Sequence, residues 1–256
     1  MLKTSMKLYF YNMKLGPRHF FKGVGYWRMR EYPWAISRVK EILENSRRNK
    51  RNKMLDIGSG DSPLAPFLAK EYGIDVIGID ADSQELYYTL EHARIIERTE
   101  NSSIAVSLAD ARKLPFLDSS FDFIASVSVF EHIPERGDSE AFREALRVLK
   151  PNGNLLLTIP YSSQYLEYSK KDRHYNARAV SERFLQYLNE YDCQLIEAIY
   201  MKQRYFPFYP YYFRLPLFIR ALFNPLFPIW SRIFLKTSRQ DEENLILCFL
   251  WIRKGV

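Results

Sequence analysis

A chain of 256 residues is long enough for one α/β domain with a buried core, and too short for two ordinary domains joined by a linker. Its two cysteines, Cys193 and Cys248, lie in or beside apolar runs, which argues against a disulfide framework and favours a reducing, cytoplasmic compartment. Residues 1–21 mix lysines with aromatic residues and contain no apolar run of the secretory type, so we expect no signal peptide.

Positive charge is concentrated in two segments of the chain. The net charge is +7, yet residues 1–30 and residues 198–240 each contain seven Lys or Arg residues and no acidic residue. Residues 31–197 contain 21 basic and 27 acidic residues, which corresponds to a net charge of −6. Both basic segments are also rich in aromatic residues, which make up 16% of the chain. We therefore expect the function of these two segments, whatever it is, to depend on their positive charge.

Apolar runs of strand length alternate with helix-period stretches, a pattern that indicates βαβ units and a sheet covered by helices on both faces. The predicted strands span residues 53–57, 74–79, 104–108, 121–129, 155–159, 194–201 and 245–252. The predicted helices span residues 34–45, 64–72, 84–97, 139–150 and 177–188. Gly73 ends the second of these helices, and the Pro-Asn-Gly run at 151–153 ends the fourth. The sequence thus predicts an α/β fold in which a basic, aromatic and partly helical extension, residues 1–52, precedes a seven-stranded domain, residues 53–256.

A turn with two glycines follows the first predicted strand, in the segment Asp56-Ile57-Gly58-Ser59-Gly60-Asp61-Ser62. Glycines let the backbone turn sharply and approach a ligand closely, and the next helix offers N–H groups at its N-terminus. The third glycine of the dinucleotide-binding fingerprint is missing, so an ordinary strand-to-helix turn stays open as the alternative.

Carboxylates follow the next two predicted strands. Asp80 ends the second strand, where its two oxygens can accept hydrogen bonds from both hydroxyls of a ribose. Asp110 and Ala111 follow the third strand, where a side-chain acceptor beside a backbone N–H suits the amino group and ring nitrogen of an adenine. Because open α/β sheets bind ligands at the carboxyl ends of their strands, we predict one crevice for a nucleotide-like ligand.

Five longer segments follow one another within residues 54–160. They are MLDIGSGDSPLA, VIGIDAD, SLADARKLPF, SFDFIASVSVFEHI and EALRVLKPNGNLLLTIP. In this order and spacing they resemble the class I methyltransferases that depend on S-adenosylmethionine, and more narrowly the group called methyltransferase type 11. The resemblance implies a Rossmann-like mixed sheet of seven strands in the order 3-2-1-4-5-7-6, with strand seven antiparallel. It also implies S-adenosyl-L-methionine as the cofactor, lying across strands one to four.

The resemblance assigns nine residues to the cofactor site: Asp56, Gly58, Ser59, Gly60, Asp80, Ala81, Asp110, Ala111 and Ser126. The residues of the glycine turn would contact the methionine part, and Asp80 would hold the ribose. Asp110 and Ala111 would hold the adenine, and Ser126 would offer its backbone to the amino-acid end. Ser62 replaces a glycine that is frequent in relatives, which leaves the detailed shape of the loop open.

Methyl transfer needs few catalytic groups, because a positive sulfur already activates the carbon and the protein mainly positions donor and acceptor. A general base helps where the acceptor is a hydroxyl, and His132 lies just past predicted strand four. Packing near the cofactor is the alternative role for His132. His174 and Tyr175 resemble the histidine-aromatic stretch that many relatives carry near the acceptor. Glu131 and His132 without a third ligand do not make a metal site, so we predict no metal.

A segment rich in aromatic and basic residues separates the last two predicted strands, over residues 203–242. Five prolines prevent one continuous helix, and no uncharged stretch approaches the roughly 20 residues that a membrane-spanning helix needs. Aromatic rings mixed with Arg and Lys suit the headgroup level of an anionic membrane. We rank three interpretations: peripheral contact with the inner face of a membrane, then a cap over the acceptor pocket, then nucleic-acid binding.

The sequence therefore predicts methyl transfer to a lipid-like or lipid-linked acceptor first and to a soluble small molecule second. An RNA acceptor ranks lower, because residues 126–129 lack the Pro-Pro-aromatic motif of many enzymes that methylate base nitrogens. Two further classes stay open. A nicotinamide-dependent oxidoreductase would use the same glycine turn and Asp80, and a catalytically inactive protein would bind the cofactor without transferring its methyl group.

Overall fold

The computed structural model describes residues 2–45, 51–97, 103–169, 172–204, 209–212, 214–239 and 245–255. The chain divides into two compact units. Unit 1 comprises residues 1–47 and 202–237, and unit 2 comprises residues 48–201 and 238–256. The N-terminal extension and the late aromatic segment thus belong to the same unit, although all of residues 48–201 separate them in the sequence.

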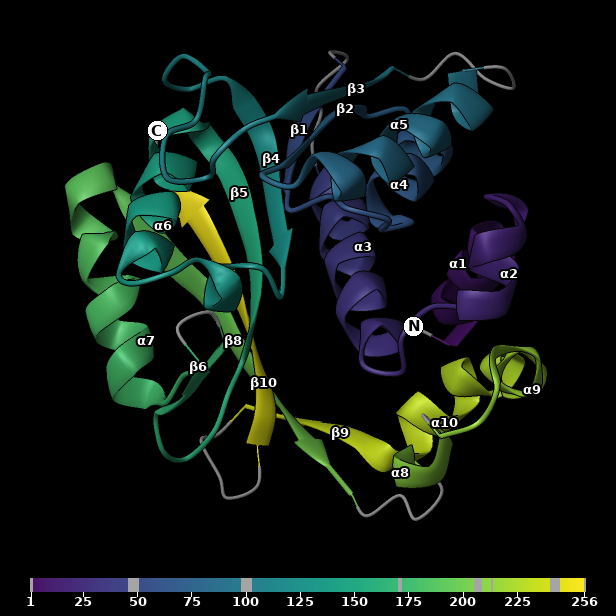
Figure 1. Ribbon diagram of the computed structural model, residues 1–256. Coiled ribbons are helices and arrows are strands. Elements are labelled where there is room, and N and C mark those ends of the chain that lie inside the picture. The colour runs from purple at the N-terminus through teal and green to yellow at the C-terminus, as the bar shows by residue number, and fades with distance from the viewer. Residues whose placement is uncertain are drawn as a thin grey trace. The chain divides into compact units, whose positions relative to one another are not determined.

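An eight-stranded sheet has the order β3-β2-β1-β4-β5-β10-β8-β9 (Figure 1). Its strands are β1 (Lys53–Ile57), β2 (Asp75–Asp80), β3 (Ile104–Leu108), β4 (Phe121–Val127), β5 (Leu149–Pro160), β8 (Cys193–Gln203), β9 (Leu235–Ser238) and β10 (Leu245–Lys254). Strands β3, β2, β1, β4 and β5 pair in parallel, and β10 pairs antiparallel with β5. The predicted Rossmann-like α/β class is confirmed, with β8 and β10 in the places predicted for strands six and seven.

The predicted number of seven strands is wrong, because β9 adds an eighth strand beyond β8. Its four residues contain one large apolar side chain, Leu235, which is too little to produce a strand pattern in the sequence. The start of β5 is also earlier than predicted. The Pro-Asn-Gly run at 151–153 lies inside the strand, and the pairing with β4 shifts register between Phe121 and Phe123, as in a β-bulge.

Helices cover both faces of the sheet in unit 2, as predicted. Figure 1 shows α4 (Leu64–Tyr72) and α5 (Ser83–Glu97) on one face, and α6 (Gly137–Val148) and α7 (Ala177–Arg183) on the other. The central strands β1 and β4 are almost entirely buried, which is typical of parallel strands covered on two sides. Gly73 ends α4 in the left-handed conformation, with φ of 63°, and its N–H donates to the carbonyl of Ala69.

Shorter elements complete unit 2. The 3₁₀ turn η1 (Phe130–His132) follows β4, and a small sheet of β6 (Leu166–Ser169) and β7 (Asp172–His174) follows β5. The helix predicted to reach residue 188 ends at Arg183, where two 3₁₀ turns, η2 (Leu185–Tyr187) and η3 (Asn189–Tyr191), continue the chain. Strand β4 ends at Val127 rather than at 129, because Ser128 adopts a φ of 49°.

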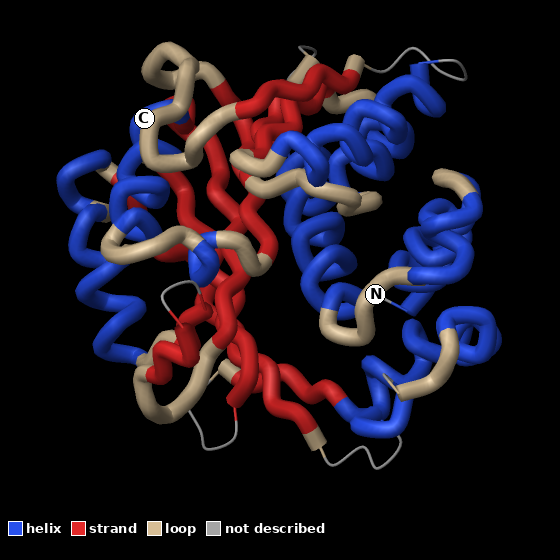
Figure 2. The backbone as a smooth tube through the Cα atoms, in the orientation of Figure 1, coloured by secondary structure: helices blue, strands red, loops and turns tan. Residues whose placement is uncertain are grey.

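Unit 1 is built mainly from helices in its described parts, and it also contains the end of β8 and most of β9 (Figure 2). Its helical elements are α1 (Leu2–Lys14), α2 (Pro17–Lys22), α3 (Arg28–Asn45), α8 (Tyr209–Tyr212), α9 (Leu217–Phe223), the 3₁₀ turn η4 (Asn224–Leu226) and α10 (Phe227–Phe234). Helix α3 begins six residues before the predicted start at 34, with Pro33 inside it. Helices α1 and α3 both contact α10, and α2 contacts α9.

A buried asparagine joins the two parts of unit 1. The Asn224 side-chain amide donates to the carbonyl of Phe21 at 3.1 Å, and its Oδ1 accepts a hydrogen bond from the Tyr212 hydroxyl. Gly23 has a φ of 63°, and a Cβ there would lie 2.6 Å from the Asn224 side chain. The ring of Phe227 packs beside Tyr212, with centroids 4.8 Å apart. These contacts make the N-terminal helices and the late helices one packed unit.

Candidate functional site

The glycine turn joins the ends of three elements in unit 2. The backbone N–H groups of Gly58 and Ser59 both donate to the carbonyl of Ile79, at 2.8 and 3.0 Å. Gly58 has a φ of 72°, and a Cβ on it would lie 2.4 Å from a methyl carbon of Val129. Only glycine fits there, because a side chain would meet both backbone strain and Val129. The end of β1 is thereby held against the end of β2 and the residue that follows β4.

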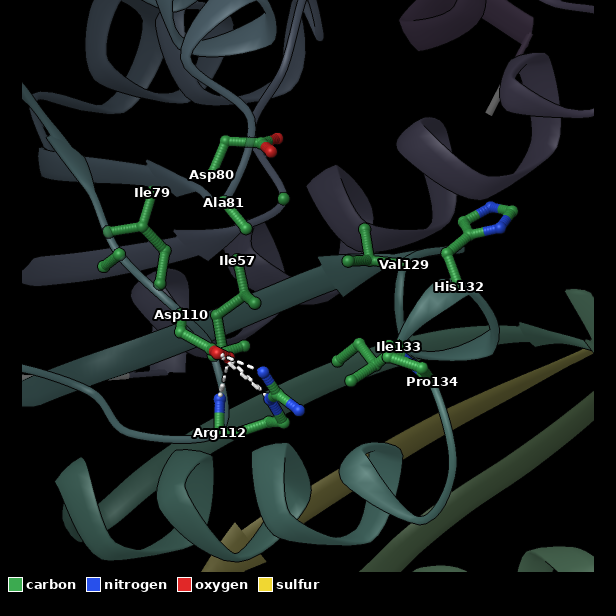
Figure 3. Close-up of a pocket in the computed structure, with 13 residues that line it drawn as sticks. Ile57, Ile79, Asp80, Ala81, Asp110, Arg112, Val129, His132, Ile133 and Pro134 are labelled. Carbon is green, nitrogen blue, oxygen red and sulfur yellow. Dashed lines mark hydrogen bonds and ion pairs between the residues drawn. The ribbon is translucent and has the colours of Figure 1, made fainter. Parts of the chain in front are cut away.

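A pocket of about 230 Å³ lies at these strand ends (Figure 3). Its lining residues are Ile57, Gly58, Ile79, Asp80, Ala81, Ala109, Asp110, Ala111, Arg112, Val129, His132, Ile133 and Pro134. Five of the nine residues predicted for the cofactor are in this lining, namely Gly58, Asp80, Ala81, Asp110 and Ala111. The candidate base His132 lines it too, with 58% of its side chain exposed. The structure thus brings two of the three predicted carboxylates and one predicted catalytic residue to one pocket.

Arg112 is a pocket residue that the sequence analysis missed. Its guanidinium turns back onto Asp110, with Nη2 2.7 Å from one carboxylate oxygen, and its backbone N–H donates to the other at 2.9 Å (Figure 3). These hydrogen bonds with Arg112 hold the pKa of Asp110 below its ordinary value. The sequence contains a signal for this contact, namely Asp-Ala-Arg directly after a strand. An aspartate at such a position can accept a hydrogen bond from the backbone N–H two residues later.

The absence of a side chain at Gly137 makes room for Arg112. A Cβ at Gly137, the first residue of α6, would lie 2.7 Å from Cδ of Arg112 and 2.6 Å from Cγ2 of Ile133. Glycine is therefore required at position 137 because Arg112 and Ile133 pack closely against it, and not because of an unusual backbone angle. The wall of the pocket at Arg112 and Ile133 depends on this glycine.

Four predicted cofactor residues lie outside the described lining of the pocket: Asp56, Ser59, Gly60 and Ser126. Asp56 and Ser126 sit on the paired strands β1 and β4 and are buried, Asp56 being 3% exposed. Among the described residues, Asp56 Oδ2 and Ser126 Oγ have no hydrogen-bond partner. Burial, and secondly the charge of Asp80, raise the pKa of Asp56 to about 7. A buried carboxyl without a full set of partners is typical of a ligand site.

The other two predicted catalytic residues lie in the small sheet region, away from the described lining of the pocket. His174 is in β7, and Tyr175 is fully buried and donates its hydroxyl to Asp138 at 2.8 Å. Burial raises the pKa of Tyr175, so its hydroxyl stays protonated and remains a donor. Their proposed action at the acceptor stays a prediction.

Tyr175 belongs to a buried polar network that reaches the pocket wall. Asp138 Oδ1 accepts a hydrogen bond from Arg183 at 2.8 Å, and its Oδ2 lies 3.6 Å from Arg173. Arg173 in turn donates to the backbone carbonyl of Ile133, which lines the pocket. The network therefore positions the segment that follows η1. A catalytic contact for Tyr175 is not needed to explain its burial.

The described residues contain no group of three or more His, Cys, Asp or Glu side chains gathered as a metal ion requires. The sequence-based expectation of no metal therefore stays a prediction.

The strand order defines a Rossmann-like α/β domain with a glycine turn and two strand-end carboxylates at one pocket. Residues 55–157 match the family model described as "Methyltransferase domain". A solved structure of a SAM-dependent methyltransferase from Methanosarcina mazei is similar over 84% of this chain and 97% of that chain, with a TM-score of 0.54 and 17% identity. The predicted resemblance to the methyltransferase type 11 group is confirmed over these residues: this part of the chain is a methyltransferase domain.

Two curated relatives each align with about half of the chain. Phosphoethanolamine N-methyltransferase 2 of Caenorhabditis elegans is 36% identical over 137 residues, which are 54% of this chain and 30% of that protein. The cyclopropane-fatty-acyl-phospholipid synthase of Escherichia coli strain K12 is 32% identical over 123 residues, which are 47% of this chain and 29% of that protein. The chain thus matches less than a third of the length of either relative.

The raised pKa of Asp56 predicts a stability that depends on pH. The folded chain keeps the Asp56 proton up to about pH 7, whereas the unfolded chain releases it near 3.8. Between these values the folded state binds more protons, so the free energy of unfolding falls as the pH rises. Asp56→Asn removes this titration. From pH 5 to pH 8 we expect wild type to lose on the order of 2 kcal/mol relative to Asp56→Asn, measured by urea denaturation without ligand.

A matched control for this measurement is Asp75→Asn, at the opposite end of the neighbouring strand β2, where the carboxylate pairs with Arg51 near the surface. Its pH profile should follow that of wild type. Parallel profiles for wild type and Asp56→Asn would contradict the assignment of a raised pKa to Asp56.

The contact between Arg112 and Asp110 predicts a second measurable pKa. Arg112→Ala should let the pKa of Asp110 rise toward its ordinary value, because the hydrogen bonds that stabilise the carboxylate are lost. Gly137→Ala should shift it in the same direction, since a Cβ there displaces the stem of Arg112. Carbon-13 NMR of the carboxyl groups measures both. Lys113→Ala, one residue on, should leave the pKa unchanged, and an unchanged value in Arg112→Ala would refute the pairing.

Proposed function

We propose that this chain is an S-adenosylmethionine-dependent methyltransferase acting on a small or lipid-like acceptor. The observation that carries the proposal is the pair of carboxylates, Asp80 and Asp110, on adjacent strand ends at one pocket of the matched domain. Open α/β sheets bind nucleotide-like ligands at this edge. The sequence alone predicts the same two positions.

The residues present fit this cofactor. Asp80, Asp110 and Ala111 line the pocket, which supports Asp80 as the acceptor for two ribose hydroxyls and Asp110 with the N–H of Ala111 as the partners of an adenine edge. Asp56 Oδ2 and Ser126 Oγ are buried polar atoms behind the turn without a partner among the described residues. Such atoms are satisfied in most proteins, so a ligand with donor groups is expected beside them.

S-adenosylmethionine, when bound, supplies a methyl group on a positively charged sulfur. The chain's own part is to position it and to exclude water, because an in-line displacement gains most from orientation. A positive charge close to Asp56, such as that of the cofactor, would lower the pKa of Asp56 and favour its ionised form. The ionised carboxylate would in turn stabilise that positive charge. His132 lines the pocket, which supports it as the group that takes a proton from an acceptor hydroxyl or ammonium group.

The lipid-like acceptor and the contact with a membrane are the finer parts of the proposal. One relative is named for a fatty-acyl phospholipid and the other for phosphoethanolamine, so the two relatives' names span lipid and small-molecule acceptors. The strong positive charge of unit 1 supports an anionic, lipid-containing partner.

Calorimetric titration with S-adenosylhomocysteine tests the donor site. Wild type should bind saturably, and Asp80→Ala should bind about 10- to 100-fold more weakly, because hydrogen bonds to a charged acceptor are lost. Asp75→Ala removes the same kind of side chain from the opposite end of β2 and should bind like wild type. No saturable binding by well-folded wild type would overturn the proposal, and tight binding of NADH instead would indicate an oxidoreductase.

Transfer of a labelled methyl group tests the acceptor. Wild type incubated with labelled S-adenosylmethionine and vesicles of total lipid extract should place label in the organic phase, and Asp80→Ala should lose that signal. Label confined to a water-soluble pool would replace the lipid-like acceptor by a small molecule. Cofactor binding without transfer to either pool would contradict enzymatic activity and favour a binding protein.

A further inference from the structure

Unit 1 carries a net positive charge that is larger than that of the whole chain. It contains 16 Lys or Arg residues and three acidic residues, a net charge of +13, whereas unit 2 has a net charge of −6. All three acids of unit 1 lie in its N-terminal part, within α3, and residues 202–237 contain none. A compact unit with this charge attracts anionic partners over about a Debye length.

Helices α9 and α10 have an inner face that packs and an outer face that is apolar. The connecting residues keep right-handed helical angles, so the residues from Leu217 to Phe234 form one nearly continuous helical stretch. Asn224, Phe227 and Ser231 recur at helical spacing and are buried inside unit 1. The face that they form is the one that holds the unit together.

The opposite face is a stripe of five exposed apolar side chains. They are Phe218, Leu222, Leu226, Ile229 and Ile233, spaced by three or four residues and between 37% and 74% exposed. At 100° per residue this stripe lies opposite the buried face. The outer face of a surface helix is normally polar, and a helix that is apolar all round belongs in apolar surroundings.

Basic side chains flank this apolar stripe. Arg214 precedes α9 and is exposed, and Lys236 follows α10 and is exposed as well. Arg232 lies near the end of α10 and is half-buried. Apolar side chains bordered by cations, without intervening acids, are the pattern of helices that lie in the headgroup region of a membrane.

We propose that the apolar stripe of α9, η4 and α10 docks on an anionic lipid bilayer. Its Leu, Ile and Phe side chains enter the boundary between headgroups and acyl chains, and Arg214, Arg232 and Lys236 meet lipid phosphates. This inference deepens the proposed function, because it names the surface by which the chain would reach a lipid-like acceptor. No described helix combines the length and the hydropathy needed to cross a membrane, so the docking is interfacial.

Two other occupants fit the stripe less well. Nucleic acid is bound by flat rings on which bases stack, and four of the five side chains in the stripe are Leu or Ile. A second copy of the chain would bring two units of charge +13 together, and like charges oppose such contacts. An anionic membrane offers acyl chains to the apolar side chains of this surface and phosphates to its basic side chains.

Flotation of the full chain with vesicles tests the proposal. Vesicles of phosphatidylcholine containing phosphatidylglycerol should carry wild type, and vesicles of phosphatidylcholine alone should carry much less. The double variant Leu222→Glu with Ile229→Glu should bind at least about tenfold more weakly, since two carboxylates would face the lipid. Arg214→Gln with Lys236→Gln should weaken binding about fivefold for each cation removed, and added salt should act in the same direction.

Leu117→Glu is the matched control, because Leu117 is an apolar residue of unit 2 that is 84% exposed and lies outside the stripe. It should bind vesicles like wild type. Failure of wild type to float with anionic vesicles overturns the proposal, as does equal loss in the control. So does binding of an RNA oligonucleotide in place of vesicles. If the stripe variants instead raise KM for a water-soluble acceptor and still float, the stripe acts as a cap.

Titration of the same samples with S-adenosylhomocysteine separates this proposal from the proposed function. The stripe variants should keep wild-type affinity for this ligand, which also shows that unit 2, where the ligand site lies, is folded. If wild type floats with vesicles but does not bind this ligand, the methyltransferase proposal is contradicted and the proposed docking surface is supported. If wild type binds the ligand but does not float, the docking surface is contradicted and the methyltransferase proposal is supported.

Discussion

The pocket depends on one carbonyl group that accepts two hydrogen bonds. The oxygen of Ile79, near the end of β2, receives the N–H groups of Gly58 and Ser59 from the turn after β1. Val129 fills the space where a side chain at Gly58 would lie, so the chain beyond β4 is drawn to the same point. Three strand ends thereby converge within hydrogen-bond and van der Waals distance, and the lining residues at these strand ends are held in place by that convergence.

The same convergence buries an acid. Asp56 lies on β1 directly before the turn, and its carboxyl is removed from water with Asp80 as a charged neighbour. A carboxylate in this position destabilises the folded chain unless a positive group comes close, because desolvation opposes its charged form. Sites that keep such residues are usually sites of function, since a core built for stability alone would place an apolar residue there.

Charge is separated between the two units of this chain. Unit 1 is assembled from two segments far apart in sequence, and it is strongly basic, while unit 2 with its pocket is acidic. Asn224 links the segments by bonding to Phe21 and Tyr212. This link turns two separate basic segments into one surface, so that the unit, rather than either segment, is the body an anionic partner would meet.

The sequence by itself determined the α/β class, the places of the main strands, and the two carboxylates at the ends of β2 and β3, because hydrophobic period and strand-end position are local properties. The tertiary structure decided what depends on contacts between distant residues. The return of Arg112 onto Asp110 needs the space left by Gly137, and the burial of Tyr175 needs Asp138. Strand β9 exists only because β8 offers it a partner, since four residues carry too little pattern to form a strand alone.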